Sequence, residues 1–233
     1  MNPSKRAVVL RELASGISSI ALGRPVRVAI DGRTASGKTT LAGELAEMLA
    51  ADRRDVIRTT IDGFHRPKIE RYARGRHSPE GYYHDARDLP AINALLLSPL
   101  GPGGNREYRT ASFDLDSDRP IEQESKLASD NAILLVDGTF LQRPELLNGW
   151  DLAIFVETTE AVSAERGIGR DTERLGGTEA ARQLYATRYQ PAYKLYESIC
   201  TPHSSADSVF NNDDFENPIL TIREDGRMLP KIA

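Results

Sequence analysis

The sequence predicts an α/β protein in which helices cover both faces of a parallel β-sheet. Apolar runs at 132–136 and 152–156, and one at 26–30 that only Arg27 interrupts, are typical of strands that are buried on both sides. Between such runs, apolar residues recur at helical spacing, as they do in 38–51 and 159–175. Strands that alternate with helices favour a parallel sheet, because each helix carries the chain back to the starting end of the sheet.

Other segments complete this pattern along the chain. In chain order they are predicted as helix 4–21, strand 56–61, helix 85–97, helix 178–199 and strand 208–210. Pro25 ends the first helix, and β-branched residues favour the strand at 56–61. No repeat and no shift in composition marks a second domain, so we expect a single domain, 1–233.

Composition and charge narrow the class of protein. The net charge of −4 argues against a protein that coats nucleic acid. No apolar run approaches the roughly 18 residues of a membrane helix, and the first residues do not form a signal peptide. The single cysteine, Cys200, excludes an intramolecular disulfide and a cysteine-only zinc site, and it suits a reducing, cytoplasmic setting.

The chemistry begins with a glycine-rich segment. Residues 32–39 read GRTASGKT, which matches the phosphate-binding loop pattern G-x-x-x-x-G-K-[ST]. A strand runs into it and a helix leaves it, and this context favours a nucleotide site over a chance match in a turn. The pattern predicts ATP and Mg²⁺, with Lys38 on the β- and γ-phosphates and the Thr39 hydroxyl on the metal. The expected nucleotide contacts are Gly32, Thr34, Ala35, Ser36, Gly37, Lys38, Thr39 and Thr40.

Two carboxylates follow predicted strands at the edge where parallel sheets bind their ligands. Asp62 heads the segment DGFHR and is a candidate general base for a hydroxyl that attacks the γ-phosphate, or else a metal ligand. Asp137, in LLVDG, is expected to hold Mg²⁺ directly or through water. The structural alternative for both residues is an Asp-Gly turn, which is a common pairing.

Three arginines recur every four residues on one predicted helix. Arg166, Arg170 and Arg174 repeat positive charge at a spacing that is mildly self-repelling, unless a phosphate chain lies against them. The alternative is a solvated helix face with local ion pairs. Glycine pairs flank the cluster, and so 163–177 is predicted to act as a lid.

Two further segments are expected on the side of the phosphate acceptor. Residues 64–84 lack a clear period and are rich in Arg, His and Tyr, and so are read as a long functional loop. Residues 104–122 contain a candidate hairpin arm at 108–115, for which a plain hairpin with an aromatic anchor is the alternative. The candidate acceptor contacts in 64–84 are Arg66, Arg71, Arg74, Arg76, His77, Tyr82, Tyr83 and His84. The second segment adds Arg109, Phe113, Asp114 and Arg119.

In order and spacing, the phosphate loop, DGFHR, the Asp137-Gly138 strand end and the arginine helix resemble the uridine kinase and phosphoribulokinase-like branch of P-loop kinases. The resemblance runs from about residue 25 to about residue 222. It implies a P-loop NTPase fold and transfer of the ATP γ-phosphate to a primary hydroxyl. It gives catalytic roles to Lys38, Asp62, Arg166 and Arg170. By position, Arg119 matches an arginine on the acceptor side of the family, and Asp137 matches a carboxylate that is usually Glu. Together with the candidates above, the expected acceptor contacts are Asp62, His65, Arg66, Tyr83, Arg119 and Arg174, and the expected metal ligands are Thr39, Asp62 and Asp137.

Departures from the family pattern fall in the acceptor segments. Uridine kinases carry a His before the arginine that matches Arg119, and here FDLDSDR has none. The Asp-His-Pro segment for ribose is replaced around Tyr82-Tyr83-His84-Asp85. The leading hypothesis is a uridine/cytidine kinase-like enzyme. A kinase of another alcohol (pantothenate, nicotinamide riboside or a sugar) and a nucleotide-gated switch remain open, as does a homo-oligomer. The partner predicted is a small molecule, with no nucleic acid and no membrane.

Overall fold

The computed structural model describes residues 3–228, and its centre is a six-stranded sheet in the order β10-β9-β8-β1-β7-β2. The strands are β1 (Val26–Gly32), β2 (Val56–Thr60), β7 (Ile133–Gly138), β8 (Leu152–Glu157), β9 (Ser208–Asn211) and β10 (Ile219–Ile222). Five of them are parallel, and β10 pairs antiparallel with β9 at one edge. The predicted α/β fold with a mostly parallel sheet is confirmed, and the strand β10 was not predicted.

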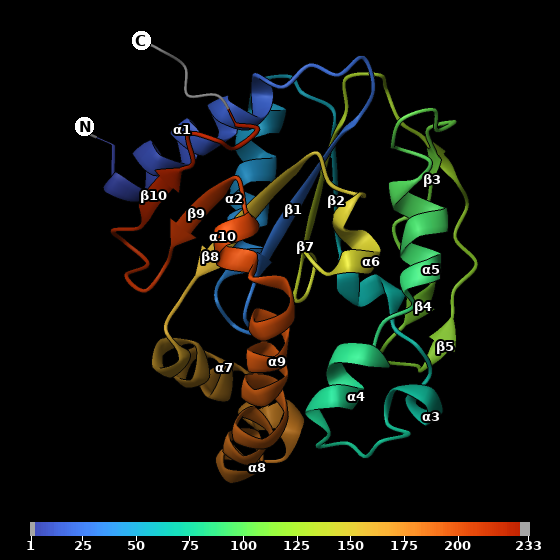
Figure 1. Ribbon diagram of the computed structural model, residues 1–233, viewed down its shortest axis with the longest axis vertical. Coiled ribbons are helices and arrows are strands. Elements are labelled where there is room, and N and C mark those ends of the chain that lie inside the picture. The colour runs from blue at the N-terminus through green and yellow to red at the C-terminus, as the bar shows by residue number, and fades with distance from the viewer. Residues whose placement is uncertain (1–2, 229–233) are drawn as a thin grey trace.

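Helices cover both faces of this sheet (Figure 1). The longer ones are α1 (Lys5–Ser18), α2 (Lys38–Ala51), α7 (Glu160–Leu175), α8 (Thr178–Leu184) and α9 (Gln190–Cys200). The short ones are α3 (Lys68–Arg71), α4 (Pro79–His84), α5 (Leu89–Ile92), α6 (Pro144–Leu147) and α10 (Pro202–Ser205). Three single turns are of other helical types. The turn η1 (Ile61–Phe64) is a 3₁₀-helix, and η2 (Asn93–Leu97) and η3 (Tyr185–Tyr189) are π-helical. Within residues 3–228, no helix has the length and apolar character that crossing a bilayer requires.

The strand residues divide between two apolar clusters, one on each face of the sheet. In β1, Val28 and Ile30 pack with Leu41 and Leu45 of α2, whereas the intervening Ala29 joins the other cluster. This alternation follows from the two-residue period of a strand. Because both faces are covered, 133–136 in β7 and 152–156 in β8 are apolar on both sides, which is why they appear as continuous runs in the sequence.

The segment 64–84 is not the long irregular loop that its composition suggested. It contains α3 and α4, and Tyr82 and Tyr83 of α4 are buried in the core. The start of α4 has a local cause: Ser78 accepts a hydrogen bond from Gly81 N at 2.9 Å, and Pro79 holds the first helical position. Such a short helix has no measurable apolar period, so the sequence pattern did not reveal it.

The second acceptor-side segment forms an arm of short hairpins. Strand β3 (Glu107–Tyr108) pairs with β6 (Lys126–Leu127), and β4 (Phe113–Asp114) pairs with β5 (Arg119–Pro120). The arm is therefore longer than the predicted 108–115. It docks on the turn η1, where Ser112 N donates to Gly63 O at 2.9 Å.

Candidate active site

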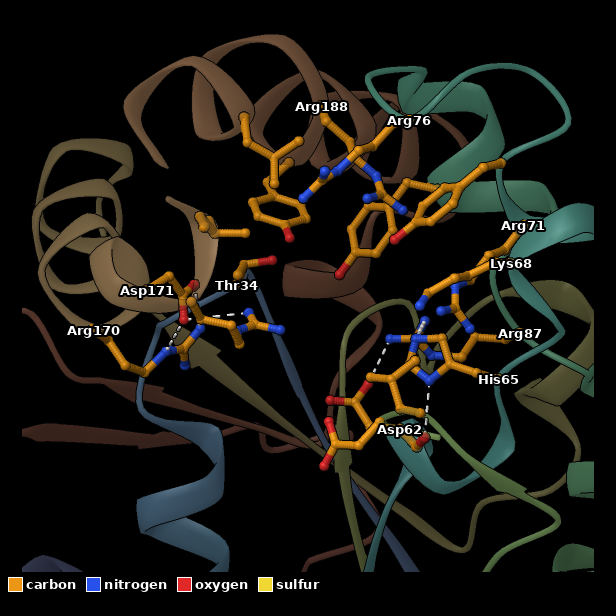
Figure 2. A pocket seen from close by; sticks show the side chains of 18 residues that line it. Thr34, Asp62, His65, Lys68, Arg71, Arg76, Arg87, Arg170, Asp171 and Arg188 are labelled. Atoms are coloured by element: carbon orange, nitrogen blue, oxygen red, sulfur yellow. Dashed lines mark hydrogen bonds and ion pairs between the residues drawn. The ribbon is translucent and has the colours of Figure 1, made fainter. Parts of the chain in front are cut away.

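The candidate site lies at the carboxyl ends of the parallel strands, where α3, α4, α7 and α8 gather at the lower end of Figure 1. Two cavities open there. One, of about 250 Å³, is lined by the phosphate loop, Arg166, Asn212 and Phe215. The other, of about 350 Å³, is lined by Asp62, by α3 and by residues of the α7–η3 region (Figure 2). Arg170 lines both cavities and so marks where they meet. We call them the nucleotide cavity and the acceptor cavity.

The loop between β1 and α2 has the backbone shape of a phosphate cradle. Gly32, Ala35 and Gly37 all have positive φ angles, of 154°, 62° and 94°. A side chain at Gly37 would collide with the Asn212 amide, so this position requires glycine. Lys38 Nζ donates to the Arg33 carbonyl at 2.6 Å and thereby lies across the loop. The predicted loop residues fit a triphosphate, which the α2 N-terminus would further stabilise.

A buried carboxylate holds the start of this cradle in place. Asp31 accepts hydrogen bonds from Gly32 N at 2.8 Å, from Gln142 Nε2 at 3.1 Å and from the hydroxyl of Tyr196. Burial raises the pKa of the Asp31 carboxyl despite these donors. Because Tyr196 belongs to α9, this cluster connects the helix to the first residue of the phosphate loop.

The lysine of the loop is itself strongly affected by burial. Desolvation lowers the pKa of Lys38 to about 8, against the attraction of Asp137, Asp31 and Asp62, while Arg170 adds repulsion. Lys38 is therefore charged at neutral pH and loses its proton easily above it. A bound phosphate chain would reverse this effect by adding negative charge.

The residues predicted to hold Mg²⁺ divide between the two cavities. Thr39 Oγ1 donates to Asp137 Oδ2 at 2.6 Å, so these two groups meet beside the phosphate loop. Asp137 is the fifth residue of β7 rather than a residue after the strand, as predicted. Asp62 instead faces the acceptor cavity. No cluster of three or more His, Cys, Asp or Glu with metal-site geometry occurs among residues 3–228. One carboxylate, one hydroxyl and nucleotide phosphates are an ordinary ligand set for Mg²⁺.

Arg58 also forms an ion pair with the Asp137 carboxylate. Its Nη1 lies 2.7 Å from Asp137 Oδ1, on the oxygen that Thr39 leaves free. Arg58 comes from the middle of β2, and its side chain is a quarter exposed. A divalent cation on Asp137 therefore has to displace a positive charge that is already there.

Asp62 has the surroundings of a reactive carboxylate. The turn η1 presents it to the acceptor cavity with 57% of its side chain exposed, and Arg87 Nη2 donates to Oδ1 at 2.6 Å. Desolvation alone would raise the pKa of Asp62, but the charges of Arg87 and Lys38 outweigh it and hold the pKa below its usual value.

His65 completes this group as a neutral residue. Burial and the neighbouring Arg87 lower the pKa of His65 to about 3. Its Nε2 accepts from Arg87, so the proton lies on Nδ1, which donates to the Asp62 carbonyl at 2.8 Å. His65 therefore supports the turn and the arginine without adding charge.

The arginines of α7 are shared between the cavities. Arg166 donates to the carbonyls of Asn212 at 2.8 Å and Asp213 at 2.9 Å, on the nucleotide side. Arg170 and Arg174 both pair with the buried Asp171, at 2.9 and 3.4 Å. The local ion pairs of the alternative are thus present for Arg170 and Arg174, while Arg166 and Arg170 line the nucleotide cavity.

Comparison with known proteins assigns this architecture to a family. The family model "PRK: Phosphoribulokinase / Uridine kinase family" matches residues 27–213. The chain belongs to this family. The resemblance drawn from the motifs is confirmed, and the chain is a P-loop kinase by family.

Individual relatives agree at low sequence identity. "Uridine kinase" of Alkaliphilus metalliredigens is 26% identical over 197 residues, covering 81% of this chain and 92% of that protein. "Uridine kinase-like protein 5" of Arabidopsis thaliana is 24% identical over 189 residues, and the alignment covers 81% of this chain but 40% of that protein. The structure titled "Structure of a Possible Uridine Kinase from Bacillus stearothermophilus" superposes with a TM-score of 0.69 at 22% identity, over 87% of this chain and 97% of that one.

Within this kinase fold, the predicted acceptor residues separate into two groups. Asp62, His65 and Arg174 line the acceptor cavity, as do Arg71, Arg76 and Tyr82 from the broader candidate set. The other predicted contacts do not line it; they are Arg66, Arg74, His77, Tyr83, His84, Arg109, Phe113, Asp114 and Arg119. Tyr83 is a core residue that packs on Phe140 and Tyr196, Arg66 lies beside Glu70, and Arg119 is exposed on β5.

Several lining residues had no sequence signal. Arg87 and Arg188 are isolated arginines in helical or loop segments, and Lys68 and Tyr72 lie around the unexpected helix α3. Arg87 was detectable only through its contact with Asp62, which the fold creates across 25 residues of chain.

Proposed function

We propose that this protein transfers the γ-phosphoryl group of ATP to a hydroxyl group of a small molecule. The observation that carries the proposal is the position of Asp62. Its exposed carboxylate faces a separate cavity beside the phosphate loop, and Arg170 lines the junction between the two. A pure nucleotide switch has no need of an ionised carboxylate in a second cavity of this size.

The nucleotide side supplies positioning and charge. In this proposal Lys38 contacts the β- and γ-phosphates, and Thr39 and Asp137 hold Mg²⁺. When bound, Mg²⁺ neutralises charge that develops on the transferred phosphoryl group. Arg166 and Arg170 stabilise the same charge from α7, since both line the nucleotide cavity.

The acceptor side supplies the base. The acceptor oxygen forms a bond to the γ-phosphorus while the bond from that phosphorus to the ADP oxygen breaks. The hydroxyl proton passes to Asp62 and from there to solvent, so the products are a phosphate ester, ADP and a proton. Arg87 fixes the Asp62 carboxylate through Oδ1 and leaves Oδ2 for the acceptor.

Two acceptor classes follow from different observations. The names of the relatives support a nucleoside such as uridine or cytidine. The lining of the acceptor cavity supports another alcohol, because it contains seven basic side chains and three acidic ones. The basic ones are Lys68, Arg71, Arg76, Arg87, Arg170, Arg174 and Arg188.

The test is release of ADP from Mg·ATP in the presence of an acceptor panel, with Lys38→Ala as the blank. The panel holds uridine, cytidine, other nucleosides, pantothenate, nicotinamide riboside and several sugars. Acceptor-stimulated release that Lys38→Ala abolishes supports the kinase. Slow hydrolysis that no acceptor stimulates would support the switch instead.

The setting proposed for this enzyme is the cytoplasm, with a small molecule rather than nucleic acid or a membrane as its partner. The single cysteine supports a reducing compartment, because a chain with one cysteine has no intramolecular disulfide to keep oxidised. We treat the kinase as one domain, 1–233, whose arm and α7 region close on the acceptor. A homo-oligomer is tested by light scattering of the purified protein.

A further inference from the structure

The acceptor cavity contains positive charge that the protein itself does not neutralise. Four of its seven basic side chains have carboxylate partners: Arg71 with Asp118, Arg87 with Asp62, and Arg170 and Arg174 with Asp171. The other three, Lys68, Arg76 and Arg188, make no ion pair within the part of the chain that the structure describes.

Arg188 is the most informative of these. Its side chain is only 5% exposed, and its Nε has no hydrogen-bond partner among residues 3–228. Three tyrosine rings surround the guanidinium, with Cζ 4.7 Å from the ring centre of Tyr82, 5.1 Å from Tyr72 and 5.6 Å from Tyr189. Arginine does not give up its proton, and a buried cation normally has an anionic partner.

The location of Arg188 shows that the anion it lacks is not the bound nucleotide. Arg188 lines the acceptor cavity and not the nucleotide cavity, which Lys38 and Arg166 line. In Figure 2, Arg76 and Arg188 enter the acceptor cavity from one side, and Asp62 lies on the opposite side. The π-helical turn Tyr185–Tyr189 places Arg188 and Tyr189 together on that wall.

We propose that the acceptor is an alcohol that already carries a phosphate or carboxylate group, and that Arg188 and Arg76 bind this group while the hydroxyl lies at Asp62. The inference rests on the proposed kinase function and names its substrate class. A guanidinium fork matches both anions through paired hydrogen bonds, and the tyrosine rings hold the Arg188 fork in place. A cavity of about 350 Å³ fits a small phosphorylated or carboxylated alcohol.

The first test measures anion binding without turnover. Inorganic phosphate is titrated by calorimetry into protein saturated with Mg²⁺ and the imido analogue of ATP, which fills the nucleotide cavity. Arg188→Gln is expected to weaken phosphate binding about 10- to 100-fold, as for loss of hydrogen bonds to a charged group. Arg182→Gln is the matched control, because Arg182 lies on exposed α8 and pairs with Glu179. Equal affinity in both variants, or no saturable binding, would overturn the proposal.

Folding of the variants is checked separately. Arg188 packs on three rings, so unchanged affinity for the ATP analogue and an unchanged Tm identify a folded Arg188→Gln protein. Arg76→Gln tests the same subsite at an exposed position and should also weaken phosphate binding. Arg188→Lys keeps the charge without the fork and should restore part of the affinity.

The second test uses matched acceptors in the ADP-release assay. The pairs are glycerate and glycerol 3-phosphate against glycerol, ribose 5-phosphate against ribose, and pantothenate against panthenol. A higher kcat/KM for the charged member, lost in Arg188→Gln, supports the proposal, and the preferred pair shows whether the group is carboxylate or phosphate. If neutral acceptors are preferred, the proposed kinase function stands, but the proposed anion-binding role of Arg188 and Arg76 is wrong. If phosphate binding depends on Arg188 but no acceptor is turned over, the anion-binding site stands and the proposed kinase function is wrong.

Discussion

Arg87 Nη2 lies 2.6 Å from Asp62 Oδ1, and the same guanidinium donates to Nε2 of His65. Arg87 is 94% buried, whereas the Asp62 side chain is more than half exposed. A rigid cation thus holds a carboxylate that faces the open cavity, and the two properties a base needs, orientation and access, come from different residues.

Asp62→Asn removes the base while keeping the size of the side chain. We expect kcat to fall about 10²- to 10⁴-fold, the usual contribution of a general base, with nucleotide affinity unchanged. Steady-state kinetics and titration with the ATP analogue check the two quantities. Loss of Mg·ATP binding would show that Asp62 is a metal ligand first.

Arg87→Gln should move the acid limb of the pH profile of kcat/KM. Removal of the opposite charge raises the pKa of Asp62, so activity is lost at a higher pH as the solution is acidified. The variant should be compared with Arg74→Gln, whose arginine pairs with Asp85 on the exposed surface. An unmoved acid limb would mean that a group other than Asp62 titrates there.

Nucleotide binding should weaken above pH 8. The pKa of Lys38 is about 8 in the free protein, where Asp137, Asp31, Asp62 and Arg170 surround it, and bound phosphates raise that pKa. The nucleotide therefore binds the protonated form more tightly. Affinity should fall by up to about tenfold per pH unit above 8, with proton uptake on binding. Calorimetry in buffers of different ionisation enthalpy measures this uptake. Lys38→Met should bind weakly and without this pH dependence.

The Mg²⁺ requirement should respond oppositely to two substitutions. Arg58→Met removes the cation that competes for Asp137 and should lower the Mg²⁺ concentration for half-maximal activity about two- to fivefold, the scale of a partly exposed ion pair. Asp137→Asn should raise that concentration. The titration is made with the acceptor and ATP held constant. A higher Mg²⁺ requirement in Arg58→Met would show that Arg58 supports the metal site instead.

The start of β1 offers a stability test far from the site. Asp151 pairs with Arg24 at 2.7 Å and with Arg27 at 3.0 Å. Burial opposes ionisation, but these hydrogen bonds lower the pKa of Asp151 to about 2. Its contribution, about 2 kcal/mol, is fully present above the unfolded pKa near 4 and is lost as pH falls toward 2. Urea unfolding of the wild type and of Asp151→Asn at pH 7 and at pH 2 measures this contribution, which should be present at pH 7 and largely lost at pH 2. Asp225→Asn, on an exposed pair with Arg223, should match the wild type at both pH values.

Strong periodic signals made the fold predictable from sequence. The buried strands and the helices α2 and α7 are long enough to show their period, and the phosphate loop needs its glycines for backbone reasons. Strand β10 was missed because it is a four-residue edge strand whose side chains are exposed or half-buried. Helix α4 was missed because six residues with buried aromatic side chains carry no helical period.

The acceptor side was less predictable for a physical reason. Its residues come from separate segments, and their roles depend on which charge meets which partner. Nothing in the sequence distinguishes Arg66 from Arg87. In the structure, Arg66 lies beside Glu70, whereas Arg87 pairs with Asp62. Only the folded chain distinguishes an arginine that has a carboxylate partner from one, such as Arg188, that makes no ion pair among residues 3–228.

The π-helical turn Tyr185–Tyr189 holds one residue more than an α-helical turn would. Loss of that residue would rotate α8 by about 100° relative to α9, because an α-helix turns through that angle per residue. Tyr193 and Tyr196 anchor α9 in the core, so the sheet and the phosphate loop would stay in place. In evolutionary terms, a single insertion or deletion in this turn can therefore change the lining of the acceptor cavity, to which Leu184 and Arg188 contribute, without any exchange of the side chains around Asp62.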